Sequence, residues 1–182
     1  MNLDQLVKRC SKQDIKAQEE LYNLYKVPLF ALCLKYCSNS SEAEDNLHDS
    51  FIEIFATIKK FNGKGSFEGW MKRITINKAI TKYKKSYSLV PIKDDYKDEI
   101  SIDEEVVDIP LNDILKHVQN LPHQYRLVFN LYELEDYSHK EIACMLSISE
   151  SASKSNLHRA KAKLKEQLLL QKNIQTKKSN GK

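Results

Sequence analysis

The sequence contains little glycine and little proline, with four residues of each in a chain of 182. Both residues interrupt regular secondary structure, so their scarcity favours long helices. No convincing alternation of apolar and polar residues predicts a strand. We therefore expect an all-α fold.

Long apolar segments are also missing. No segment approaches the run of roughly 20 apolar residues that a membrane helix requires. The first residues, Met1-Asn2-Leu3-Asp4, lack the basic and apolar regions of a signal peptide. The sequence therefore predicts a cytoplasmic protein without membrane insertion.

Metal-binding patterns are weak. The cysteines lie in apolar helical patterns, where a free thiol behaves as a small hydrophobic side chain; they are Cys10, Cys33, Cys37 and Cys144. Cys33 and Cys37 are four residues apart and could touch one metal ion, but no second pair with ligand spacing accompanies them. The sequence predicts no metal and no other cofactor.

The net charge of +4 is too small to identify a partner, but its distribution is informative. No acidic residue occurs between Met71 and Tyr87 or over residues 151–165. A helix that is only solvent-exposed normally mixes both signs, whereas charge of one sign favours a polyanion. An acidic segment separates the two basic ones, with carboxylates at Asp94, Asp95, Asp98, Glu99, Asp103, Glu104, Glu105 and Asp108.

Residues 137–164 predict two helices joined by a tight turn. Ser138 and Glu141 form a capping box at the start of the first helix, and Ser149 is placed to cap the second. One face of the second helix is expected to pack against the domain, through Ser153, Leu157, Ala160, Leu164 and Leu168. The opposite face is basic, through Lys154, His158, Lys161 and Lys165, with Ser155 and Arg159 beside them. A charged face is normal for any surface helix, but this one is typical of a helix that enters a DNA groove.

Three earlier segments predict an N-terminal helical bundle. Two apolar stripes form core faces: Leu21, Tyr25, Leu29, Leu32 and Tyr36 in one, and Leu47, Phe51, Ile54, Phe55 and Ile58 in the other. Ser41-Glu42-Ala43-Glu44 is interpreted as a capping box that begins the second helix, and the glycines of residues 62–66 are expected to end it. A third helix, over residues 67–85, is expected to turn Phe67, Trp70, Met71 and Ile74 inward.

The pattern divides the chain into two small helical domains, residues 1–85 and 111–170. Between them, residues 86–110 are rich in charge and contain Pro91 and Pro110, which predicts a flexible acidic linker. Residues 171–182 are polar and predict a frayed tail.

From about Asp14 to Leu168, this arrangement resembles a bacterial RNA polymerase sigma factor of the extracytoplasmic-function group. Four blocks carry the resemblance, and their order and spacing are more specific than any one block. They are Leu21-Tyr22 with Tyr25, Glu42-Ala43-Glu44-Asp45 running into Asp49-Ser50-Phe51, Gly65-Ser66-Phe67 with Trp70-Met71, Arg73-Ile74 and Asn77, and Lys154-Ser155 with Leu157-His158-Arg159-Ala160-Lys161.

The resemblance implies three partners: core RNA polymerase, contacted at its clamp coiled coil and flap, promoter DNA, and an anti-sigma factor. The clamp coiled coil would be met by exposed carboxylates. The residues at the matching positions are Glu44, Asp45, His48 and Asp49. His48 stands where the family usually has glutamine. The alternative for Glu44 and Asp45 is that they only complement the helix dipole, because they lie in the first turn of their helix.

The resemblance also implies that the first domain opens the minus-10 element and reads it as single strand. Phe61 and Asn77 would help to form a pocket for a flipped base, although Phe61 could instead end the core stripe. The loop residues Asn62, Lys64 and Ser66 would accompany them. Arg73, Lys78 and Lys82 would contact the DNA backbone.

The second helix of the C-terminal motif would enter the major groove at the minus-35 element. The residues expected to meet DNA are Lys154, Ser155, Asn156, His158, Arg159 and Lys161, with Lys163 and Lys165 on phosphates. Arg159 suits a bidentate contact to guanine. Ser147 stands where the family's turn usually has glycine, and Asn156 where arginine is common.

The function that the sequence predicts is therefore that of a sigma factor, which directs core polymerase to promoters and is not itself an enzyme. Two alternatives remain. One is a helix-turn-helix regulator that acts without stable polymerase binding. The other is a metal-dependent enzyme that uses the acidic segment, which matches no ordered ligand loop and contains no histidine.

Overall fold

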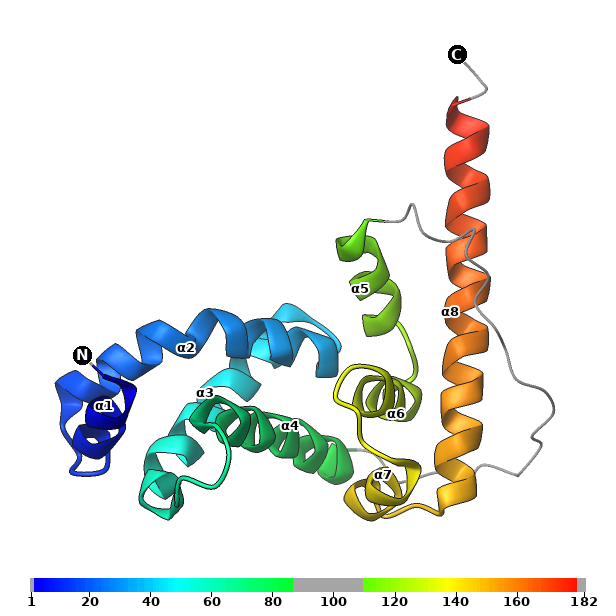
Figure 1. Cartoon of the computed structure of the whole chain (residues 1–182). Helices are drawn as coiled ribbons and strands as arrows, with labels where there is room; N and C mark the ends of the chain where they lie inside the picture. The colour runs from blue at the N-terminus through cyan, green and yellow to red at the C-terminus, as the bar shows by residue number, and fades with distance from the viewer. Residues whose placement is uncertain (1, 87–109, 180–182) are drawn as a thin grey trace. The chain divides into compact units, whose positions relative to one another are not determined.

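The computed structural model describes residues 2–86 and 110–179, which form only helices and connecting loops (Figure 1). The expected all-α fold is confirmed for this part of the chain. The predicted acidic linker lies outside the described residues, apart from its two end positions. The chain divides into two compact units, residues 1–83 and 84–182.

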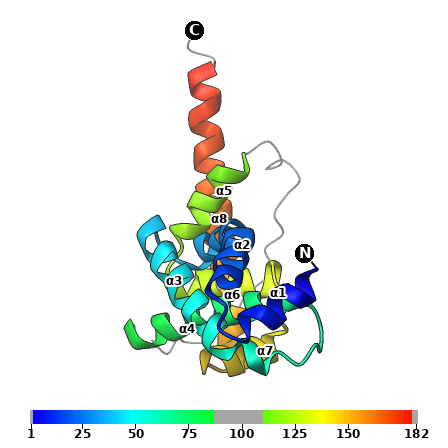
Figure 2. The same cartoon turned by 90° about the vertical axis from the view of Figure 1, so that its left-hand side faces the viewer.

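The first unit contains helices α1 (Leu3–Cys10), α2 (Ile15–Tyr36) and α3 (Ser40–Thr57), a 3-10 turn η1 (Ile58–Lys60), and α4 (Phe67–Ser86) (Figure 1 and Figure 2). Asp14 caps α2, because its carboxylate accepts a hydrogen bond from the Ala17 backbone at 3.1 Å. The Arg9 guanidinium lies 2.8 Å from the same carboxylate and is the main cause that lowers the pKa of Asp14. One residue thus joins α1 to the start of α2.

The expected cap of α3 is wrong. The helix begins at Ser40, and the Asn39 side chain accepts the hydrogen bond from the Glu42 backbone at 2.9 Å. Glu42 reaches back to the Ser38 backbone at 3.0 Å. The sequence pattern around Ser41 therefore contains the right kinds of residue but places the cap two positions too late. The helix also ends earlier than expected, at Thr57.

The core of the first unit combines the two predicted apolar stripes with α4. Its buried residues include Leu21, Leu29, Leu32, Leu47, Phe51, Ile54, Met71, Ile76 and Ile80. Asn46 is also buried and donates hydrogen bonds to the Thr75 carbonyl and to Cys33 Sγ, which links three helices. Ile74 was expected in the core but is only partly buried, since the inward face of α4 turns through Thr75 and Ile76 instead.

The second unit contains α5 (Leu111–Gln119), α6 (His123–Glu133), α7 (His139–Leu146) and α8 (Glu150–Ser179). Val118, Leu121, Ala160 and Leu164 form a buried cluster, against which Ile114, Tyr125 and Phe129 pack. This cluster fixes α5 and α6 against the middle of α8.

Two expectations in the second unit are wrong. Residues 171–179, which were expected to belong to a frayed tail, continue α8, which ends at Ser179. Cys144 is exposed, unlike the other three cysteines. It falls on the outward side of α7, whose buried face is carried by Ile142 and Leu146.

Candidate nucleic-acid interface

The predicted helix-turn-helix is formed by α7 and α8. Both hydrogen bonds of the capping box are present, from the Ser138 backbone to Glu141 at 2.8 Å and from the Glu141 backbone to Ser138 Oγ at 3.3 Å. Ser149 caps α8 by accepting a hydrogen bond from the Ala152 backbone at 3.0 Å. The local sequence therefore specifies both helix starts.

The turn between these helices passes through the left-handed region. Ser147 has φ 57° and ψ 46°, a conformation that glycine adopts with less strain. The Ile148 backbone donates to the Ala143 carbonyl at 3.0 Å and closes the turn. Serine is therefore accommodated at the position where the family usually has glycine.

His139 connects the two helices of the motif. Its Nδ1 lies 2.9 Å from Ser153 Oγ on α8, and its ring stacks on Tyr132 with centroids 4.4 Å apart. Burial lowers the pKa of His139, and the nearby Lys154 ammonium adds to this effect. The neutral imidazole is therefore favoured at this junction.

The residues predicted to meet DNA on α8 do not share one exposed face. Lys154 is exposed, and His158, Arg159 and Lys161 are partly buried. Ser155 and Asn156, which were expected at the interface, are buried with exposed fractions of 3% and 0%. The expectation that Ser155 and Asn156 lie on the exposed face of α8 is therefore wrong.

The geometry of α8 explains the burial of Asn156. It lies three residues after Ser153 and four before Ala160, so it faces the same side as these two buried residues. Neither polar atom of its amide has a hydrogen-bond partner within the described residues. Asn156 therefore belongs to the packed side of the helix.

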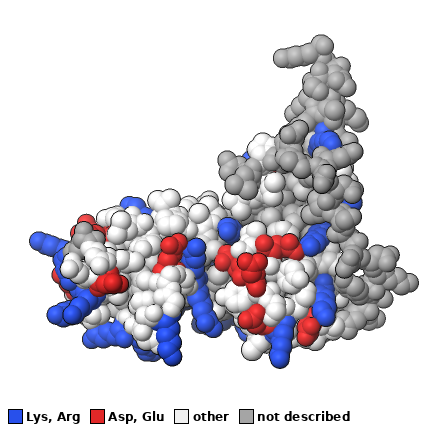
Figure 3. Space-filling view, viewed as in Figure 1, with Lys and Arg blue, Asp and Glu red and all other residues white. Residues whose placement is uncertain are grey.

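Two of the basic side chains of α8 are paired with carboxylates. Lys154 Nζ lies 3.1 Å from Glu150, and Lys161 Nζ lies 2.8 Å from Glu133 on α6. The expected single-sign face is therefore partly neutralised, by Glu150 next to the stretch 151–165 and by Glu133 on another helix. Figure 3 shows basic and acidic side chains next to one another on the visible face.

The residues predicted to bind polymerase share the outer side of α3. Glu44, Asp45, His48 and Asp49 are all exposed, while Ala43, Asn46, Leu47 and Ser50 face the core. Beside them lies a cavity of about 450 Å³ between α2 and α3, lined by Tyr22, Lys26, Val27, Phe30, Glu44, Leu47 and His48. The surface thus joins carboxylates to an apolar groove.

Phe61, at the start of the predicted minus-10 loop, is partly buried. Its ring packs against Phe67 and Trp70, with centroids 5.1 Å and 5.7 Å away. It also lines a cavity of about 270 Å³ together with Asp4 and Lys8 of α1, a helix outside the site predicted from the sequence. Phe61 therefore packs in the aromatic cluster and also lines a cavity at the surface.

The loop after Phe61 is exposed over residues 62–66. Gly63 and Gly65 adopt φ values of 74° and 82°, which L side chains rarely adopt. Asn62 accepts a hydrogen bond from the Lys64 backbone at 3.1 Å, and Ser66 accepts one from Gly69 at 3.0 Å at the start of α4. The loop is thus held at both ends and exposed between them.

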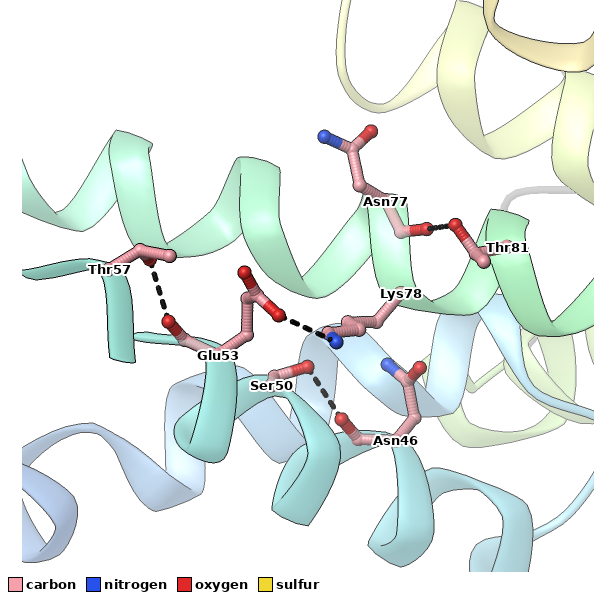
Figure 4. A network of polar contacts seen from close by, with 7 residues as sticks. All are labelled: Asn46, Ser50, Glu53, Thr57, Asn77, Lys78 and Thr81. Atoms are coloured by element: carbon pink, nitrogen blue, oxygen red, sulfur yellow. Dashed lines mark hydrogen bonds and ion pairs between the residues drawn. The ribbon is translucent and has the colours of Figure 1, made fainter. Parts of the chain in front are cut away.

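The predicted DNA-contacting residues of α4 fall into two groups. Arg73 and Asn77 are exposed, whereas two lysines pair with carboxylates of α3: Lys78 with Glu53 at 2.9 Å and Lys82 with Asp45 at 3.5 Å. Asn77 and Phe61 border different cavities, because Asn77 lines one of about 290 Å³ with Glu53, Ile74, Lys78 and Thr81. Figure 4 shows this region of α3 and α4.

Glu53 was not identified from the sequence. It lies one turn after Asp49 on the same helix, so the spacing of the carboxylates on α3 could have indicated it. Its pairing with Lys78 spans 25 positions and needs the packing of α3 on α4.

Residues 2–86 and 110–179 hold no group of three or more His, Cys, Asp or Glu side chains suited to a metal ion. In the same ranges, none of the helices combines the length and the apolar composition of a membrane span.

Two family models match the chain in order: Sigma-70 region 2 over residues 21–88, and Sigma-70, region 4 over residues 111–164. The chain is 27% identical over 182 positions to the ECF RNA polymerase sigma factor SigW of Bacillus subtilis, covering 92% of this chain and 97% of that protein. It is 28% identical over 171 positions to the ECF RNA polymerase sigma-E factor of Haemophilus influenzae, covering 86% and 89%.

A similar fold occurs in the sigma factor RpoE of Bartonella quintana, solved in complex with the anti-sigma factor NepR. The TM-score is 0.52 at 20% sequence identity, and the match covers 83% of this chain and 95% of that one. At this identity the similarity concerns the fold.

Proposed function

Because this chain belongs to the sigma-70 family of RNA polymerase sigma factors, in its extracytoplasmic-function (ECF) group, we propose that α3, α4 and α8 divide its contacts among polymerase and two promoter elements. The observation that carries the proposal is the presence of both family regions, in order, on the two helical units. Sigma factors are promoter-recognising initiation factors, and the catalysis belongs to the polymerase. A helix-turn-helix regulator is not favoured, because it would not account for region 2.

The proposed polymerase surface is the outer side of α3. Glu44, Asp45 and Asp49 present exposed carboxylates that suit the arginines of a clamp coiled coil. The adjoining groove between α2 and α3 offers apolar surface through Val27, which is 69% exposed. Charge would orient the encounter, and burial of the groove would then stabilise the complex.

The proposed minus-10 surface consists of the loop after Phe61 and the exposed side of α4. Asn62, Lys64 and Ser66 lie in an exposed, glycine-containing loop that the backbone of a single strand can approach closely. Arg73 and Asn77 follow at helical spacing on α4, where they would contact phosphates and base edges. Lys78 and Lys82 would contribute once their carboxylate partners are displaced or shared.

The proposed minus-35 surface is the start of α8. Lys154, His158 and Arg159 are the side chains with exposed surface there, and a guanidinium suits the O6 and N7 atoms of guanine. Lys161 and Lys163 would lie on phosphates. Ser155 and Asn156 would support the helix from its buried side, and the flap of the polymerase would hold this unit in the holoenzyme.

The remaining expected partner is an anti-sigma factor. The Bartonella quintana protein was solved with one, and this chain shares its fold. We place the activity in the cytoplasm, where core polymerase and promoter DNA occur together.

The test is transcription with purified core RNA polymerase and a pool of random promoter fragments. We expect the chain to comigrate with core enzyme and to yield transcripts from fragments that share two elements at one spacing. If the chain binds an operator but never core enzyme, the regulator alternative replaces this function.

A further inference from the structure

His139, the first residue of α7, lies where this helix packs against α6 and α8 (Figure 1). Its Nδ1 lies 2.9 Å from Ser153 Oγ on α8, and its ring stacks on Tyr132 of α6. Its Nε2 has no hydrogen-bond partner within residues 2–86 and 110–179. Because a hydroxyl both donates and accepts, Ser153 stays bonded whether the imidazole is neutral or charged. The ring can therefore take up a proton without leaving its place.

Charged side chains from both neighbouring helices act on this ring. They are Glu133 on α6 and Glu150, Lys154 and Lys161 on α8. In the free protein these four groups form two ion pairs, of Lys154 with Glu150 at 3.1 Å and of Lys161 with Glu133 at 2.8 Å. Each ammonium is balanced by a carboxylate at close range, so the four groups together carry no net charge beside the imidazole.

DNA binding changes this balance. Both lysines, Lys154 and Lys161, belong to the proposed minus-35 surface, where phosphates compete with the two carboxylates for the ammonium groups. A lysine that turns to a phosphate leaves a carboxylate without its counter-charge beside His139, and the DNA brings further negative charge. Negative neighbours stabilise the imidazolium form of a histidine.

We propose that binding of the minus-35 element draws a proton onto His139, which couples promoter recognition to pH. The coupling is reciprocal, so a proton on His139 raises the affinity for DNA by the same factor by which DNA raises the affinity for the proton. This inference rests on the function proposed above and adds a means of regulation to it.

The sign follows from the two states of the ring. In the free protein, burial holds the pKa of His139 below the ordinary value of 6.5, so the ring is neutral at neutral pH. In the DNA complex its pKa is higher. Promoter binding should therefore strengthen as the pH falls through the pKa of the complex, and level off below the pKa of the free protein.

The test measures promoter binding by the holoenzyme, assembled from core polymerase and the full chain, on a fluorescent duplex selected from the promoter pool. Kd is measured from about pH 8 to about pH 5.5 at constant ionic strength, for the wild type and for His139→Gln. Over this range the Kd of the variant divided by that of the wild type should rise by about three- to tenfold, since a pKa that rises by one unit gives a tenfold gain at most. The pH dependence of the polymerase itself cancels in this ratio.

His117→Gln is the matched control, because it removes a histidine of the same unit. His117 on α5 bonds to Gln171, which lies about 27 Å further along α8 than Ser153, so this variant should keep the wild-type profile. Glu133→Gln is a second test that leaves the imidazole in place. It removes the carboxylate that Lys161 leaves behind, so binding should gain less on acidification than in the wild type. Thermal melting at each pH shows whether every variant is folded.

The outcomes separate the two proposals. If the ratio stays constant over the whole range, or if wild-type binding weakens relative to His139→Gln as the pH falls, the inference is wrong and the sigma-factor function stands. The inference also fails if Glu133→Gln gains as much as the wild type, or if His117→Gln loses as much as His139→Gln. A wild-type holoenzyme that binds no promoter of the pool at any pH would instead overturn the proposed function.

Discussion

The ammonium group of Lys82 on α4 lies 3.5 Å from the carboxylate of Asp45 on α3. The pair joins a residue of the proposed DNA surface to a residue of the proposed polymerase surface. Both side chains are substantially exposed, at 43% and 65%, so solvent screens the attraction and the pair contributes little to stability. The pair makes polymerase compete with Lys82 for Asp45, because an arginine that binds Asp45 would release Lys82 toward DNA.

Asp45→Asn should therefore strengthen the binding of the free protein to nonspecific DNA while changing the free energy of unfolding by less than about 1 kcal/mol. Because one more lysine can release counterions, the slope of log K against log salt should steepen by about 0.9. Titrations by fluorescence anisotropy at several salt concentrations measure this slope. Asp49→Asn removes the same charge from the same helix, at a carboxylate without a lysine partner among the described residues. Equal slopes in both variants would point to net charge alone.

Arg159→Ala should weaken promoter binding by the holoenzyme in a sequence-dependent way, by about 1–3 kcal/mol on the preferred minus-35 element. The reason is the loss of a guanidinium that suits guanine. Lys163→Ala, at an exposed position on the same helix, should weaken binding by a similar factor on every sequence. Filter binding on matched and mutated elements distinguishes the two patterns, and a uniform loss for Arg159→Ala would assign it to phosphate.

Asn156→Leu should stabilise the second unit by about 1–3 kcal/mol, since both polar atoms of this buried amide lack a partner within the described residues. Leucine has the same branched shape as asparagine and no polar atoms to desolvate. Chemical denaturation followed by circular dichroism measures the change. Asn46→Leu is the control, because Asn46 is equally buried but donates hydrogen bonds to Thr75 and Cys33, so the same substitution should destabilise.

The stability of the second unit should decrease on acidification because of His139. Burial lowers its pKa in the folded protein below the ordinary value of 6.5, so the unfolded chain binds more protons in the window below pH 6.5. The contribution of His139 to the free energy of unfolding therefore falls as the pH drops through this window. Above the window this contribution stays constant. In His139→Gln this part of the pH dependence should be absent from denaturation curves measured between pH 5 and about pH 7.5.

Local patterns predicted much of the fold correctly. The apolar stripes at Leu21 and Leu47 are core faces, and the capping box at Ser138 is present with both hydrogen bonds. Such features depend on residues within one or two turns, so the sequence encodes them directly. The cap of α3 shows the limit, because Asn39 and Ser41 are both good caps and only the path of the chain chooses between them.

The candidate site was less predictable. Helical spacing alone placed Ser155 on the basic face of α8, but the structure buries it together with Asn156. The carboxylates that pair with Lys78 and Lys82 are 25 and 37 positions away. No local pattern predicts such pairs, since they depend on how α3 packs against α4.

The sequence by itself determined the helical periodicity, the two basic segments, the helix starts around Ser138 and Ser149, and the order of motifs that identifies the family. These follow from residue types at short spacing. Tertiary structure alone decided which polar side chains remain at the surface, which lysines are paired, and that Glu53 borders a cavity with Lys78. The physical reason is that burial and ion pairing depend on the distance between helices, whereas periodicity records only the direction of a side chain around its own helix.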